Sequence, residues 1–342
     1  MLHSPWLQFA DKLSLLDSHD IVRRLYFEKH DRKLNEQQSR EIVSNISQGR
    51  AYFDSAKTSD LIVRPLLQYY GVLALARAAI LLSSRNIRET ALAASHGLGT
   101  PDWKGTLSAG TENWLTGKLR VENGTFTQFE QVVGRQGHWE ISRGSGGPLR
   151  LRGGVYDALS HGCEFSVLDV VSRMPQVAPL LEELTAHRAM CWDAHALIQG
   201  ARCQITVSPN KGGLPSRDEM NEWFAVSGDD RLDETIADYV DTGVTPILEH
   251  RFTVDDTPRM LQKLKHLHPL GNCLVAPLAT GETVNPLALT FAAAFALGMF
   301  VRYHPGDWMG VLGHQRGDVL LPLTREISDS TARFPSDLLE AL

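Results

Sequence analysis

Two long apolar segments dominate the pattern of hydrophobic positions along the chain. Residues 65–84 contain very few charged side chains, and residues 286–302 contain only a threonine and a closing arginine among apolar neighbours. Proline suits the first turn of a helix, and both segments begin with one. Because a helix that is apolar on every side has to be buried, the pattern predicts two central helices, packed side by side.

The remaining pattern is helical near the N-terminus and changes after about residue 100. Apolar positions keep helical spacing through the first sixty residues, whereas glycine, threonine and tryptophan become more frequent between 100 and 160. Asn123-Gly124 lies between 118–122 and 125–129, and this arrangement predicts a β-hairpin, since Asn-Gly accepts the positive φ angles of a tight turn. Further short strands are expected at 138–142, 149–152 and 203–208.

These elements predict a mainly α protein with a mixed α/β insertion. The helical core is expected to come from the N- and C-terminal parts of the chain, namely 1–100 together with 283–342. Residues 101–282 form the insertion, and the sequence leaves open whether it folds independently.

Composition and charge narrow the classes of function. The 342 residues include 34 Lys and Arg against 40 Asp and Glu, a net charge of −6, which disfavours a protein that coats nucleic acid through overall basic charge. The N-terminus lacks the pattern of a secretory signal. The most apolar run, 287–301, is shorter than the roughly 20 residues that span a bilayer. A cytoplasmic protein without a membrane partner is expected.

Standard catalytic motifs are absent from the sequence. We find no H-E-x-x-H, G-x-S-x-G, G-x-x-x-x-G-K-[ST] or G-x-G-x-x-G pattern, and the four cysteines lack zinc-site spacing. We therefore expect neither a metal nor a cofactor, and the sequence leans away from an enzyme without excluding one.

Four side chains in or beside the apolar helices are candidates for anion binding. A charged residue in an apolar helix needs a partner or access to water, and a cation is favoured at a helix C-terminus. The structural alternative assigns them to ion pairing, dipole compensation and packing. The candidates are Arg77, His96, Arg302 and Trp308.

Residues 131–155 form the one clearly basic stretch of this acidic chain. Four arginines accompany a single glutamate there, and a tryptophan is available for stacking on bases. The alternative is a solvated hairpin whose arginines pair with carboxylates elsewhere. The candidates for nucleic-acid binding are Arg135, Trp139, Arg143, Arg150 and Arg152.

Several blocks at both ends of the chain, in order, resemble the YaaC-like proteins of bacteria. The resemblance implies a mainly helical intracellular protein, and it implies no reaction, substrate or catalytic residue. The blocks are Tyr26–Lys29, Ser47–Phe53, Arg64–Leu67, Tyr69–Gly71, Ser95–Leu98, Asn285-Pro286, and Gly298 through Tyr303 to Pro305 and Trp308.

The helical ends also resemble, more distantly, the HEPN superfamily, many of whose members cut RNA with an Arg, four to six residues, His motif. The weak catalytic candidates on that resemblance are Arg24 and His30. Four such spacings occur in the chain and about three are expected by chance, so the spacing alone carries no signal.

The leading hypothesis from sequence is a soluble, non-enzymatic binding or scaffold component. Its partner would be a protein or a nucleic acid, within a multi-component bacterial system such as phage defence. The alternatives are a metal-independent endoribonuclease and a protein that binds a nucleotide or small anion.

Overall fold

The computed structural model describes residues 12–134, 137–143, 149–153, 156–199, 202–223, 235–236, 248–253, 266–268, 273–313 and 319–342. The chain divides into two compact units, of which the first comprises the residues up to Val133, Ala158–Leu168 and Leu287–Leu342. The second comprises Gly134–Asp157 and Asp169–Pro286. The predicted fold class, mainly α with a mixed α/β part and a core from both ends of the chain, is confirmed. The division at 100 and 283 stays a prediction.

The first unit is a helical assembly with one small antiparallel sheet. The sheet has the order β1 (Leu98–Gly99), β2 (Lys118–Val121), β5 (Glu164–Ser166). The helices are α1 (Lys12–Leu15), α2 (His19–His30), α3 (Glu36–Thr58), α4 (Arg64–Ser83), α5 (Trp103–Ser108), α6 (Thr125–Val133), α11 (Pro286–Tyr303), α12 (Pro305–Leu312), α13 (Leu320–Thr331) and α14 (Phe334–Ala341), with the 3-10 helices η2 (Glu89–Ala91) and η3 (Thr111–Thr116).

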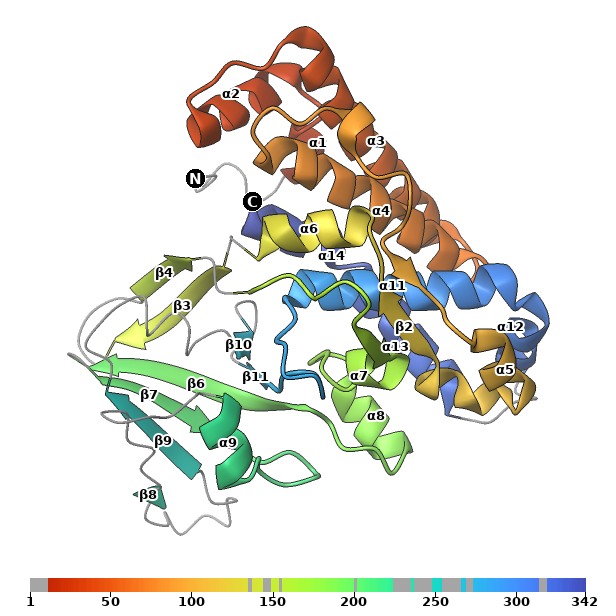
Figure 1. Cartoon of the computed structure of the whole chain (residues 1–342), viewed down its shortest axis with the longest axis vertical. Helices are drawn as coiled ribbons and strands as arrows, with labels where there is room; N and C mark the ends of the chain where they lie inside the picture. Colours follow the sequence, from red (N-terminus) through yellow and green to blue (C-terminus); the bar gives the residue numbers. More distant parts are fainter. Residues whose placement is uncertain are drawn as a thin grey trace. The chain divides into compact units, whose positions relative to one another are not determined.

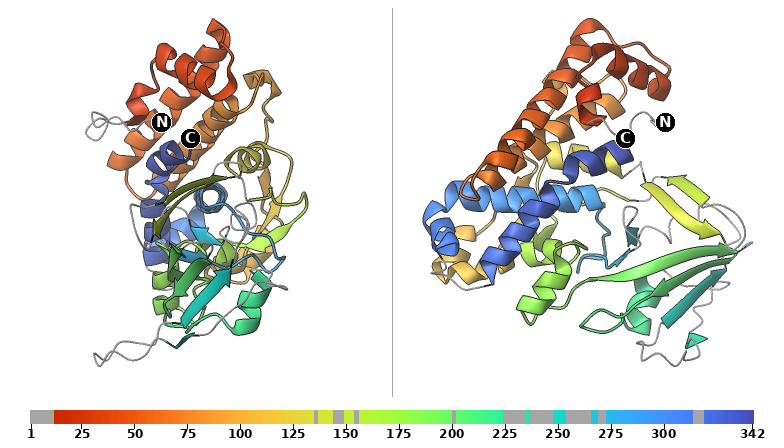
Figure 2. Two further views of the ribbon diagram at one scale, coloured as in Figure 1. Left: turned by 90° about the vertical axis from the view of Figure 1, so that its left-hand side faces the viewer. Right: turned by 180° about the vertical axis from the view of Figure 1, so that it is seen from behind.

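Helices α3 and α4 pack as a close pair, which Figure 1 shows in orange. Glycines make the close approach possible: a Cβ at Gly49 would lie 2.6 Å from Leu75 Cγ, and one at Gly71 would lie 2.7 Å from Phe53 Cδ2. Figure 2 shows α11 passing across one end of this pair.

The two predicted central helices are confirmed as α4 and α11, and both are largely buried. They meet where the ring of Tyr69 lies against the rings of Phe291 and Phe295, with centroid distances of 6.4 and 5.6 Å. By length and composition alone, each would be long and apolar enough to cross a membrane, but most of each helix is buried inside the protein, as in the core helix of a soluble protein.

The predicted hairpin at Asn123-Gly124 is wrong in its second half. Its first strand exists as β2, but β2 pairs with β1 and β5, and residues 125–133 form helix α6. Phe126, Phe129 and Val133 have helical spacing, so a helix buries all three on one side. Packing of Phe126 and Phe129 against Phe291, at centroid distances of 5.4 and 5.9 Å, outweighs the local turn preference.

The close approach of α4 and α11 predicts that Gly298→Ala destabilises the protein by about 1–3 kcal/mol, the usual cost of overpacking a core. A Cβ at Gly298 would lie 2.8 Å from Tyr69 Cβ, so one of the helices has to shift. The matched control is Gly306→Ala in α12, where a Cβ meets nothing within 4 Å. Thermal denaturation should show a lower Tm for Gly298→Ala only, and equal values would contradict the packing argument.

The second unit contains a mixed sheet. Its main path has the order β10 (Leu267–His268), β11 (Cys273–Val275), β6 (Cys191–Gln199), β7 (Arg202–Val207), β9 (Leu248–Thr253), β8 (Thr235–Ile236). Strand β3 (Gly137–Arg143) pairs antiparallel with β4 (Leu149–Gly153) and parallel with β6. Helices α8 (Ala178–Leu184) and α9 (Arg217–Trp223) belong to this unit, and α7 (Val167–Val171) spans the boundary in the sequence. The strands expected at 138–142, 149–152 and 203–208 are confirmed.

Candidate functional site: a tyrosine–histidine–arginine cluster

A polar cluster in the first unit surrounds the hydroxyl group of Tyr69, a side chain that is fully buried. The Tyr69 hydroxyl lies 2.6 Å from Nδ1 of His96, which is only half-buried. The two rings also meet edge to face, at a centroid distance of 5.6 Å. Tyr69 therefore connects the packed interior of α4 and α11 to a histidine at the surface.

The outer part of the cluster is an arginine among tyrosine rings. Arg302, exposed at the end of α11, donates from Nη1 to the hydroxyl oxygen of Tyr70 at 2.8 Å. Its guanidinium also lies over the ring of Tyr303, 5.0 Å from the centroid, and Tyr303 is 60% exposed. The ring of Tyr52 stacks on Tyr70 at 5.7 Å. We call Tyr52, Tyr69, Tyr70, His96, Arg302 and Tyr303 the tyrosine–arginine cluster.

Local structure explains how these side chains come together. Successive residues of a helix point about 100° apart, so Tyr69 faces the core while its neighbour Tyr70 remains half-exposed. His96 is held by the loop before β1, where Gly97 has a φ of +84° and the carbonyl of His96 accepts from the backbone N–H of Phe126 at 2.9 Å. Arg302 lies in the last turn of α11, where the helix dipole favours a cation.

The electrostatics of the cluster favour the neutral forms of Tyr69 and His96. Burial raises the pKa of Tyr69 well above its usual value, so its hydroxyl keeps its proton. Burial first, and then the positive charge of Arg302, lower the pKa of His96 below its usual value. At neutral pH the cluster therefore has one net positive charge, on Arg302. Within the described residues, no carboxylate lies within 4.0 Å of that guanidinium.

Of the four sequence candidates for anion binding, His96 and Arg302 belong to one cluster, since they bond to the neighbouring residues Tyr69 and Tyr70. Trp308 is buried in the core, where its Nε1 donates to the carbonyl of Ile62 at 3.0 Å. Arg77 lies 3.8 Å from the carboxylate of Glu89, and it makes this contact with Nη2. Trp308 and Arg77 thus have packing and pairing contacts of their own.

The weak catalytic candidates Arg24 and His30 both lie on α2. Arg24 is exposed, whereas Nε2 of His30 donates to the carbonyl of Leu82 at 2.9 Å. The His30 ring also packs on Tyr26, at a centroid distance of 4.3 Å. These contacts anchor α2 to the end of α4.

The nucleic-acid candidates fall on the basic stretch 131–155. Arg135 lies outside the described residues, and so do the side chains of Trp139, Arg143, Arg150 and Arg152, although their backbone forms β3 and β4. Their role stays a prediction.

Sequence reasoning about single residues missed Tyr52, Tyr70 and Tyr303. Each of the three belongs to a block that carries the family resemblance. Gly49, Gly71 and Gly298 belong to the same blocks, and they permit the close packing on which the cluster rests.

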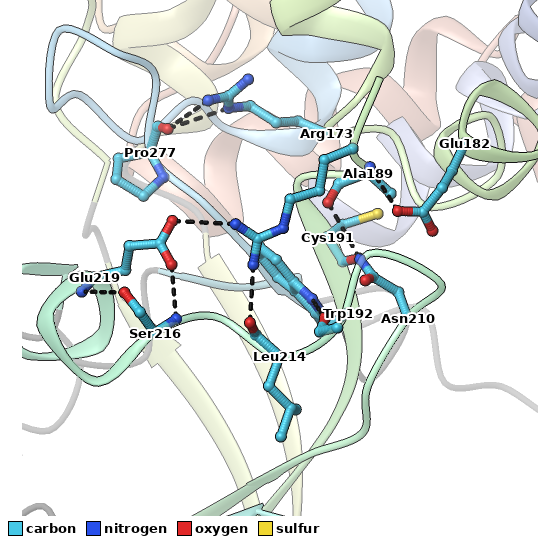
Figure 3. Close-up of polar contacts among 12 residues, drawn as sticks. Arg173, Glu182, Ala189, Cys191, Trp192, Asn210, Leu214, Ser216, Glu219 and Pro277 are labelled. Carbon is cyan, nitrogen blue, oxygen red and sulfur yellow. Dashed lines mark hydrogen bonds and ion pairs between the residues drawn. The ribbon is translucent and has the colours of Figure 1, made fainter. Parts of the chain in front are cut away.

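A second polar cluster lies in the second unit, and its contacts are structural (Figure 3). Figure 3 shows Arg173 at the carbonyl of Pro277, Glu182 at the N–H of Ala189, and Glu219 joined to Ser216. Most of these bonds go to backbone groups, so they fix loops around β6 and β11. In the described part of the chain no group of three or more His, Cys, Asp or Glu could hold a metal ion.

The fold is that of a mainly helical protein, and the cluster places an exposed arginine beside tyrosine rings. The family model described as YaaC-like Protein matches residues 10–342, nearly the whole chain. The chain belongs to the YaaC-like family, which confirms the resemblance seen in the sequence. No curated protein and no solved structure matches it.

Proposed function

We propose that this YaaC-like chain is a non-enzymatic, cytoplasmic binding protein, and that the tyrosine–arginine cluster binds a phosphorylated ligand that contains a planar ring, such as a nucleotide. The observation that carries the proposal is the exposed guanidinium of Arg302, which has tyrosine rings around it and no carboxylate partner among the described residues. The proposal adopts the nucleotide-binding or small-anion-binding alternative from the sequence analysis and assigns it to the tyrosine–arginine cluster.

The chemistry of the side chains supports a phosphate and a ring together. Arginine binds phosphate through two parallel, charge-assisted hydrogen bonds, and among the described residues Arg302 donates one hydrogen bond, from Nη1. Tyrosine faces stack on planar rings, which contributes about 1–3 kcal/mol per base in nucleic-acid complexes. The exposed ring of Tyr303 and the half-buried rings of Tyr52 and Tyr70 offer such faces.

The ribonuclease alternative has less support, because the Nε2 atom of His30 is occupied by a backbone carbonyl. A protein or nucleic-acid partner, and a place in a multi-component system such as phage defence, stay predictions. Affinity purification of the tagged full chain from its native cell, analysed for protein and for nucleic acid, tests them.

The proposal predicts that nucleotides stabilise the wild-type protein and that Arg302→Gln weakens their binding about 10–100-fold, the effect of losing about 1.5–3 kcal/mol of charged hydrogen bonding. Thermal-shift measurements with a panel of nucleoside mono-, di- and triphosphates provide the readout, since a ligand at 100 times its Kd adds about 2.7 kcal/mol of stability.

The matched control is Arg325→Gln, an exposed arginine on α13 of the same unit. It removes the same charge without touching the cluster, so its nucleotide affinity should equal that of the wild type. Absence of a shift with every nucleotide, or equal weakening by both substitutions, would overturn the proposal.

A further inference from the structure

The hydrogen bond between Tyr69 and His96 has a consequence for the ligand. We propose that Tyr69 is a positioning residue that fixes the tautomer of His96, so that His96 presents a neutral Nε2–H donor to a phosphate oxygen beside Arg302. This inference rests on the proposed function for the identity of the ligand, whereas the tautomer itself is a property of the free protein.

The donor and acceptor roles follow from burial. The Tyr69 hydroxyl is fully buried and keeps its proton, and its hydrogen-bond partner is Nδ1 of His96 at 2.6 Å. A neutral imidazole has one N–H and one bare nitrogen. A buried O–H needs an acceptor, and among the described residues Nδ1 of His96 is the one hydrogen-bond partner of the Tyr69 hydroxyl. The phenol therefore donates, Nδ1 is the bare nitrogen, and the imidazole proton is on Nε2.

A protonated His96 would break this arrangement. Its Nδ1–H would point at the Tyr69 oxygen, so the hydroxyl proton would have to turn towards another acceptor in the packed interior. An unsatisfied buried donor is costly. The charged and titratable groups that act electrostatically on this hydrogen bond are Tyr70 on α4, and Arg302 and Tyr303 on α11. Arg302 also opposes a second positive charge on His96.

A neutral Nε2–H of His96 and the guanidinium of Arg302 together offer one neutral and up to two charged hydrogen bonds, which suits a phosphate monoester. A site that relies on an imidazolium loses affinity as the pH rises through about 6.5. A site with a neutral Nε2–H donor keeps its affinity over that interval. Between pH 7.0 and 8.5 the phosphate is mainly a dianion, so affinity should change little there.

The tautomer is tested on the ligand-free full chain by long-range ¹H–¹⁵N NMR of the histidine rings, with the His96 signals assigned from their loss in His96→Gln. We expect Nε2–H in the wild type and a mixture of both tautomers in Tyr69→Phe. Tyr70→Phe, which removes the neighbouring hydroxyl but not the bond to His96, should keep the wild-type pattern. A wild-type Nδ1–H tautomer, or an unchanged pattern in Tyr69→Phe, would overturn the inference.

The binding arm uses adenosine 5′-monophosphate and titration calorimetry between pH 7.0 and 8.5. We expect nearly constant affinity for the wild type and weaker binding by Tyr69→Phe, by about twofold where the two tautomers are equally populated, because only the Nε2–H form donates to the phosphate. If the nucleotide fails to bind the wild type, the proposed function fails and the ligand part of the inference fails with it, while the NMR result still decides the tautomer. If the nucleotide binds both proteins equally, the positioning role alone is wrong.

Discussion

Replacing Arg173 by leucine is expected to lower the free energy of unfolding of the second unit by about 3–5 kcal/mol, as is typical when one partner of a buried charged network is removed. The Arg173 side chain is 5% exposed. It donates to the backbone carbonyls of Asp169, Ala276 and Pro277, at distances between 2.7 and 3.2 Å. Leucine fills the space but leaves these carbonyls without their donors.

The charge balance around Arg173 explains why a lysine should not replace it. Burial lowers the pKa of the guanidinium, and the neighbouring carboxylate of Asp169, 3.3 Å away, acts in the opposite direction. The planar fork of arginine reaches residues 169 and 276–277 at once, whereas an ammonium group is a single point of donation. Arg173→Lys is therefore expected to recover only part of the loss.

Denaturant unfolding followed by circular dichroism and tryptophan fluorescence measures the effect of Arg173→Leu. The matched control is Arg40→Leu on α3, which breaks an exposed ion pair with Glu36 between side chains that are 66% and 76% exposed. Such a pair contributes about 0.5 kcal/mol or less. A similar loss in both variants would show that the buried contacts of Arg173 do not stabilise the second unit.

The sequence predicted best the two helices that can be recognised from their own composition, whatever packs against them. The segments 65–84 and 286–302 correspond to Arg64–Ser83 and Pro286–Tyr303. A segment that is apolar on every side is buried whatever surrounds it, so its composition is sufficient evidence. Their contact was also predictable, since no other segments concentrate apolar surface to the same degree.

Helix α6 shows where local signals fail. Burying Phe126 and Phe129 contributes about 1.5–3 kcal/mol of stability for each ring. The preference of Asn123-Gly124 for a tight turn is smaller than this. The rings that the two phenylalanines pack against belong to Phe291 and Phe334, more than 150 positions away. No pattern within a short window contains that information.

The candidate site was predictable only in part, because contacts between distant positions also bring its residues together. Arg302 was identified because a cation at the end of an apolar helix is conspicuous, and His96 because it follows one. The bond between His96 and Tyr69 joins positions 27 apart, and that between Arg302 and Tyr70 joins positions 232 apart. The tyrosines could be assigned to the site only when the fold showed which face of α4 remains open.

Replacing Trp308 by alanine is expected to lower the free energy of unfolding by about 3–5 kcal/mol, the range for truncating a large buried aromatic side chain. Trp308 is 1% exposed, packs edge to face on Phe300 at 5.9 Å, and donates from Nε1 to the carbonyl of Ile62 at 3.0 Å. These contacts attach α12 to α11 and to the turn before α4, so the substitution removes packing and a hydrogen bond together.

Trp308→Phe separates this structural role from the anion-binding role that the sequence suggested for Trp308. Phenylalanine keeps most of the apolar contact with Phe300 but loses the donor to Ile62, so we expect a smaller loss of about 1–2 kcal/mol. Nucleotide affinity should stay at the wild-type value, because the indole N–H already has a protein acceptor. Denaturant unfolding and titration calorimetry of the same protein samples measure both quantities. Weakened binding in Trp308→Phe without lost stability would place Trp308 in the site beside Arg302 and would contradict its assignment as a packing residue.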